Sequence, residues 1–169
     1  MSMRKLFLTF FGTGLSPVYP RLIAMLVALV SGVAILYTMG METLFMLALA
    51  VSLIGIFEIN QYQRAQNIEA FNDYKDEDGT IVIDKAAGIW FSLLIPYTTA
   101  LSLSYPYALE LSVVFSFASF WFFDHRKPST IGWIARNVIG GLGVMGSAIL
   151  SGFAGGFLTI ILLMGIGKL

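Results

Sequence analysis

Residues 22–39 read LIAMLVALVSGVAILYTM, a run that contains no charged residue. A helix of about 17–25 apolar residues is long enough to cross the hydrocarbon core of a bilayer. The stretch therefore predicts a membrane-spanning helix. We predict an all-α fold, that of a polytopic helical membrane protein.

Four further apolar runs extend this pattern along the chain, at residues 42–59, 86–104, 107–123 and 138–166. We predict about five membrane-associated helices in a single membrane-embedded domain, residues 1–169. Short turns at Gly40-Met41 and Tyr105-Pro106 join the first four helices into two hairpins. The basic and apolar start of the chain has no cleavage site of small residues, which predicts an uncleaved interfacial segment.

The overall composition agrees with a membrane environment. Apolar residues make up 57% of the chain and charged residues only 12%, whereas soluble domains carry about 25% charged residues. The net charge is zero and the basic residues are scattered, so we expect no nucleic-acid partner. The chain has no cysteine and a single histidine, His125, which excludes disulfides and a zinc site built from several histidines.

The positions of lysine and arginine predict the orientation in the membrane. With the N-terminus in the cytoplasm, nine of the ten basic residues fall on the cytoplasmic side, as the positive-inside rule requires. A cytoplasmic loop then covers about residues 60–85. Its first part has a helical pattern that extends the second helix, and its acidic part, NDYKDEDG at 72–79, predicts turns.

The last apolar run carries small residues at four-residue steps, which allow helices to approach closely in lipid. We interpret this face as a helix-packing surface, and it also leaves room for a homodimer. Its members are Gly143, Ser147, Ala148, Ser151, Gly152, Gly155 and Gly156.

Four polar motifs fall at the predicted cytoplasmic ends of the helices, so the topology brings them to one membrane face. They are GTGLSP at 12–17, IDKAAGIW at 83–90, DHRKP at 124–128 and RNVIGGLG at 136–143.

Two carboxylates in these motifs are candidate metal ligands. Asp84 precedes a predicted helix, so it is either an N-terminal cap or a functional residue. Asp124 follows a helix end, where the helix dipole disfavours negative charge, so a counter-ion, a metal or solvent must stabilise it. Facing one site, Asp84 and Asp124 would suit Mg²⁺, which prefers oxygen ligands.

The basic residues and glycines of the last two motifs have two interpretations each. Lys127 and Arg136 are suited to holding a phosphate, but they also fit a membrane-surface role at lipid head groups. Gly140 and Gly141 would let the backbone approach a ligand closely, but glycines also serve helix packing.

Over most of its length the chain resembles the phosphatidylglycerophosphatase A family. The resemblance is carried, in order and spacing, by FGTGLSPVYP (11–20), IVIDKAAGIW (81–90) and FFDHRKPSTIGWIARNVIGGLGVM (122–145). It implies a bacterial inner-membrane enzyme that uses Mg²⁺ to remove the terminal phosphate of phosphatidylglycerophosphate at the inner leaflet. The resemblance implies that Asp84 and Asp124 are catalytic and bind the metal. It implies phosphate or lipid contacts for Ser16, Lys127, Arg136, Asn137, Gly140 and Gly141.

The chain departs from the pattern expected of this family at polar positions. Residues 20–25 read PRLIAM where PGTxGS is expected, and Lys85 stands where the family has Glu. Ala135 replaces an acidic residue, and Ser147 with Ala148 replaces an Asp pair. We expect Lys85 to form an ion pair with Asp84 or Asp124 in the place of the metal.

Three functional hypotheses follow. The first is a magnesium-dependent phosphatase acting on a phospholipid. The second is a catalytically inactive or redesigned member of the same fold that binds lipid or has a structural role. The third, a small transporter or channel, ranks last because no charged residue falls convincingly at mid-membrane, where transport pathways usually carry one.

Overall fold

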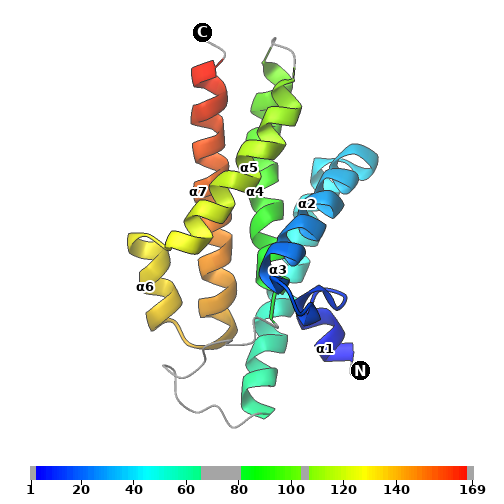
Figure 1. Cartoon of the computed structure of the whole chain (residues 1–169), viewed down its shortest axis with the longest axis vertical. Coiled ribbons are helices and arrows are strands. Elements are labelled where there is room, and N and C mark those ends of the chain that lie inside the picture. Colours follow the sequence, from blue (N-terminus) through cyan, green and yellow to red (C-terminus); the bar gives the residue numbers. More distant parts are fainter. Residues whose placement is uncertain (1–2, 66–80, 104–106, 167–169) are drawn as a thin grey trace.

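The computed structural model describes residues 3–65, 81–103 and 107–166, and all regular structure within these ranges is helical (Figure 1). This confirms the all-α class. The acidic stretch at 72–79 and the turn at Tyr105-Pro106 lie outside the described residues. The elements are α1 (Met3–Leu8), a 3₁₀ turn η1 (Thr13–Leu15), α2 (Pro20–Met39), α3 (Met41–Ala65), α4 (Ile83–Ser102), α5 (Ala108–Arg126), α6 (Ser129–Asn137) and α7 (Gly140–Ile166).

Three of the described helices, α2, α3 and α7, are long and apolar enough to cross a membrane. They carry large exposed apolar side chains such as Val30, Leu53 and Phe157, which suit contact with lipid tails. The other two predicted spans form helices as well, but α4 and α5 do not meet the same combination of length and apolar composition. The structure therefore supports three spans directly, and the cytoplasmic N-terminus stays a prediction.

Helix α4 is the centre of the fold. Every residue from Ile83 to Leu94 is buried, because α2, α3, α5 and α7 all pack against this helix. Ser92 on α4 and Ser116 on α5 each donate a hydroxyl hydrogen bond to the other's backbone carbonyl, at 3.1 and 3.0 Å. Since protein rather than lipid surrounds it, α4 can carry polar residues that a lipid-facing span could not.

The small-residue face of α7 packs inside the same chain. A Cβ added to Gly152 would collide with the backbone carbonyl of Gly88 on α4, and one added to Gly155 would lie 2.9 Å from the backbone nitrogen of Phe120 on α5. Close backbone approach is what such faces provide, so the packing interpretation is confirmed. Since α4 and α5 of the same chain occupy this face, the face gives no support to a homodimer, which remains a prediction.

The helix boundaries differ from the prediction at the ends of the last three helices. Helix α6 lies between the predicted helices at 107–123 and 138–166: Lys127 closes α5 with a left-handed φ of 42°, and Pro128 is the N-cap of α6. Helix α7 begins at Gly140, whose φ of 70° suits glycine. The predicted Gly40-Met41 turn is present, with Gly40 at φ 87°, and α3 extends to Ala65 as expected.

The N-terminal segment packs onto the start of α4. The amide of Val82 donates a hydrogen bond of 3.0 Å to the carbonyl of Leu8, and the rings of Phe10 and Trp90 meet edge to face. Figure 1 shows one end of the helices with the α1–η1 segment, α6 and the start of α7. The other three polar motifs thus lie toward the end where α4 begins with the motif at 83–90.

Candidate functional site

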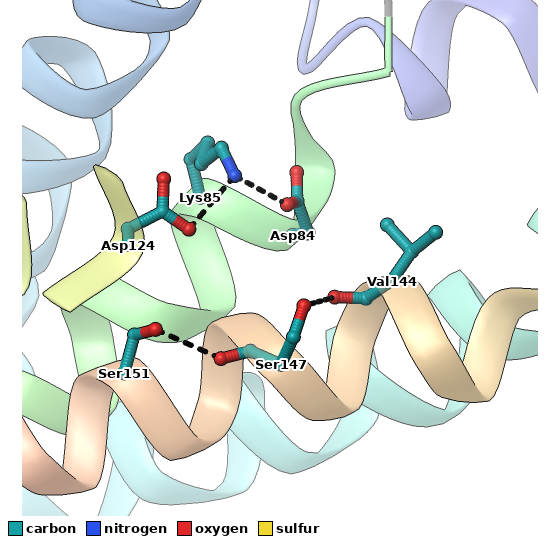
Figure 2. Close-up of polar contacts among 6 residues, drawn as sticks. All are labelled: Asp84, Lys85, Asp124, Val144, Ser147 and Ser151. Carbon is teal, nitrogen blue, oxygen red and sulfur yellow. Dashed lines mark hydrogen bonds and ion pairs between the residues drawn. The ribbon is translucent and has the colours of Figure 1, made fainter. Parts of the chain in front are cut away.

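The first turn of α4 and the last turn of α5 bring three charged side chains together (Figure 2). The Lys85 ammonium donates to Asp84 Oδ2 at 2.7 Å and to Asp124 Oδ1 at 3.0 Å. Helices α4 and α5 run side by side in opposite directions, so Lys85 meets a residue 39 positions further along the chain. We call Asp84, Lys85 and Asp124 the charged triad.

The charged triad is shielded from solvent. Asp84, Lys85 and Asp124 are only 4%, 6% and 8% exposed. Burying unpaired charge is very costly, so buried carboxylates and ammonium groups require partners. The triad supplies such partners, and the predicted ion pair of Lys85 is confirmed with both carboxylates.

The structure decides between the interpretations of the two carboxylates. The residue that caps α4 is Val82, and Asp84 is the second residue inside the helix, so the capping alternative for Asp84 does not hold. Asp84 lies in the first turn, where the helix dipole still favours negative charge. Asp124 lies in the last turn of α5, where the dipole opposes it, and Lys85 provides the counter-ion that its position demands.

One buried oxygen of the charged triad has no hydrogen-bond partner among the residues that the structure describes. Asp84 Oδ1 is buried and accepts no hydrogen bond from any residue that the structure describes. A buried acceptor left unpaired costs about 1–3 kcal/mol. Such atoms are uncommon and are often associated with a function.

The residues around the charged triad do not fit a magnesium ion. Within the described ranges, no group of three or more His, Cys, Asp or Glu side chains is placed to hold a metal. The ammonium of Lys85 already lies between the two carboxylates (Figure 2), and its positive charge would repel a cation there. The charged triad is a poor magnesium site for two reasons: it offers two carboxylates only, and it contains a positively charged ammonium.

Ser147, at a position where the resemblance leads us to expect an acidic residue, uses its hydroxyl within its own helix. Its Oγ donates to the carbonyl of Val144 at 3.0 Å, and Ser151 Oγ donates to the carbonyl of Ser147 at 2.9 Å (Figure 2). These local bonds satisfy the hydroxyls without a ligand.

The predicted phosphate-binding residues on α5 and α6 lie at helix ends. Lys127 is the exposed residue that closes α5. Partial burial of its ammonium lowers the pKa of Lys127 below its ordinary value, and the positive charge of Lys85 lowers it further. Arg136 is exposed in the last turn of α6, and Asn137 donates to the carbonyl of Trp133 at 2.8 Å.

The two glycines at the start of α7 contact a residue that sequence reasoning missed. The amide of Gly141 donates to Asn60 Oδ1 at 2.7 Å, and a Cβ on Gly140 would collide with the same oxygen. Asn60 lies in a polar run directly after the apolar residues 42–59, and that change in composition was the available signal. Ser16 lies between η1 and α2, where its hydroxyl donates to the carbonyl of Val18 at 3.2 Å.

The sequence of the chain matches a known protein family. Residues 6–163 match the family described as Phosphatidylglycerophosphatase A. Phosphatidylglycerophosphatase A of Escherichia coli (strain K12) is 28% identical over 145 residues, which cover 84% of this chain and 73% of that protein. No solved structure matches the chain. The family match includes the charged triad and all of α2 to α6, and the chain belongs to the phosphatidylglycerophosphatase A family.

Proposed function

We propose that this protein acts on the phosphate of a phospholipid of the phosphatidylglycerophosphate type, at the cytoplasmic surface of the bacterial inner membrane. The observation that carries the proposal is the charged triad, buried within the region that matches the family. The helices that are able to cross a membrane support access to a substrate held in the bilayer.

The proposed reaction is hydrolysis of a phosphate monoester. A water oxygen bonds to the terminal phosphorus as the water gives one proton to Asp84, the bond from phosphorus to the glycerol oxygen breaks, and Asp84 passes that proton to the leaving glycerol oxygen. Asp84 Oδ1 is the triad oxygen without a hydrogen-bond partner among the described residues, which suits it to accept the proton of the water. Asp124 and Lys85 hold Asp84 in place, and Lys127 offsets the charge of the phosphate.

A second candidate is a catalytically inactive member of the family that binds phospholipid. The pairing of Lys85 with both carboxylates favours it. Each carboxylate that an ammonium neutralises is a weaker base and a weaker metal ligand. In this candidate Lys127, Arg136 and Asn137 remain as contacts for a lipid head group, since Lys127 and Arg136 are exposed cations.

Phosphate release from phosphatidylglycerophosphate in detergent micelles, with and without Mg²⁺, tests both candidates. The parent is compared with Asp84→Asn, and with a variant that combines Lys85→Glu, Ala135→Asp, Ser147→Asp and Ala148→Asp. Release by the parent that Asp84→Asn abolishes supports the phosphatase.

The other outcomes separate the second candidate from failure of both. An inactive parent beside an active combined variant supports the inactive member, provided that the parent still binds phosphatidylglycerophosphate micelles. A folded parent that neither releases phosphate nor binds the lipid refutes both candidates.

A further inference from the structure

We infer that Lys85 is a built-in counter-ion: its ammonium holds Asp84 and Asp124 together in the place of a divalent cation, and removing its side chain opens a site for such a cation. The inference goes beyond the proposed function, because it concerns which cation pairs with the two carboxylates. It holds whether or not the protein hydrolyses lipid.

The geometry of the charged triad is that of two carboxylates around one cation. One oxygen of each carboxylate points at the same nitrogen, at 2.7 and 3.0 Å (Figure 2). Mg²⁺ binds carboxylate oxygens at about 2.1 Å and Ca²⁺ at about 2.3–2.6 Å. Each carboxylate would need to move by less than about 1 Å to reach an ion at the nitrogen's position.

The charges decide which cation the position accepts. Two carboxylates and one ammonium leave the charged triad with a net charge of minus one. A divalent cation entering beside Lys85 would reverse the sign of this charge and face the ammonium at short range. Without Lys85, the two carboxylates match the charge of a divalent cation, and Mg²⁺ is commonly bound by one or two carboxylates and several waters.

A second observation at the same place concerns the other oxygen of Asp84. Asp84 Oδ1 is buried without a hydrogen-bond partner within the described part of the chain, and Asp84 as a whole is 4% exposed. Lys85 therefore satisfies one oxygen of Asp84, and no other described residue donates to the second oxygen. A cation bound in place of the ammonium is free to contact either oxygen, and its waters can donate to the second one.

The two hydrogen bonds of Lys85 hold its ammonium in a buried position. Adjacent residues of a helix do not face each other, yet Lys85 reaches back to Asp84 while it also reaches Asp124. Ala86 and Ala87 after it are fully buried. The chain thus fixes the cation covalently and needs no exchange with ions from solution.

The test uses the purified full chain in detergent and measures Mn²⁺ binding by electron paramagnetic resonance, because sites that suit Mg²⁺ and Ca²⁺ also suit Mn²⁺. Thermal unfolding with Mg²⁺ and with a chelator is recorded in parallel. We expect the parent to show no saturable Mn²⁺ binding in the low millimolar range and no change of Tm. We expect Lys85→Ala to bind Mn²⁺ at least about tenfold more tightly than the parent, and Mg²⁺ to raise its Tm.

Two control variants separate this effect from a general gain in negative charge. Arg126→Ala removes an exposed cation in the last turn of α5 and should leave Mn²⁺ binding as weak as in the parent. Lys85→Ala combined with Asp124→Asn removes one of the two carboxylates and should lose the new site.

Three results would overturn the inference: saturable Mn²⁺ binding by the parent, no Mn²⁺ binding by folded Lys85→Ala, or an equal gain in Arg126→Ala. If Lys85→Ala does not fold, Lys85→Gln replaces it, since glutamine keeps most of the volume without the charge. Saturable binding by Lys85→Gln supports the inference and its absence refutes it. None of these readouts depends on phosphate release, so failure of the proposed function would remain a separate result.

Discussion

Replacing Lys85 with methionine isolates the contribution of its charge to stability, because methionine keeps an unbranched apolar chain of similar length. The substitution leaves Asp84 and Asp124 buried, at 4% and 8% exposure, without their shared ammonium. Removing one partner of a buried ion pair typically costs about 3–5 kcal/mol. Since Lys85 serves two carboxylates, we expect a loss of about 4 kcal/mol or more in the free energy of unfolding.

A triple variant provides the matched control for this prediction. Replacing a whole buried ion group with neutral residues is often close to neutral for stability. Asp84→Asn and Asp124→Asn added to Lys85→Met should therefore recover most of the loss, although the amides keep some unpaired polar atoms. Arg4→Ala breaks the more exposed pair with Glu58 and should cost under about 1 kcal/mol.

Unfolding in detergent, followed by tryptophan fluorescence, measures these differences. Trp90 is a suitable reporter, because it is buried on α4 and its indole donates to the carbonyl of Ala28 at 2.9 Å. If Lys85→Met lies within about 1 kcal/mol of the parent, or if the triple variant is no more stable than the single one, the account of the charged triad as a mutually dependent unit is wrong.

Two further predictions concern helix packing and the start of α7. Gly152→Val should destabilise the fold by about 1–3 kcal/mol or more, because the new side chain meets the backbone carbonyl of Gly88. Gly165 has open space around it, so Gly165→Ala should have little effect. Equal effects of the two substitutions in the same unfolding assay would contradict this. Asn60→Leu removes the acceptor of the Gly141 amide and should cost about 1–3 kcal/mol, with faster hydrogen exchange at the start of α7; unchanged exchange there would count against the contact.

The position of the charged triad connects the fold with the family assignment. Asp84 and Asp124 are implied as metal ligands by the resemblance, and the structure brings them to one nitrogen. The same structure places Lys85 where a cation would lie. A member of the family can therefore pair these two carboxylates with a lysine and not with a metal. The phosphate-release experiment measures catalysis, and the Mn²⁺ experiment measures metal binding.

The sequence by itself determined the class of the fold and the position of most helices. Runs such as residues 22–39 and 138–166 are long enough to cross a bilayer and contain no charge, so their burial in lipid or protein follows from length and composition. Gly40 marked a helix turn, and the small residues of α7 indicated close packing. These features are local, since each depends on residues within a few turns of the chain.

Only the tertiary structure decided which helix lies at the centre and which charges meet. Helix α4 does not meet the combination of length and apolar composition that α2, α3 and α7 meet, yet α4 is the most buried, because four neighbouring helices cover it. Lys85 and Asp124 are 39 residues apart, and the Asn60–Gly141 contact spans 81 residues. Hydrophobic periodicity fixes the faces of a helix but not its partners, so the pairing of the charged triad arises from how α4 and α5 pack.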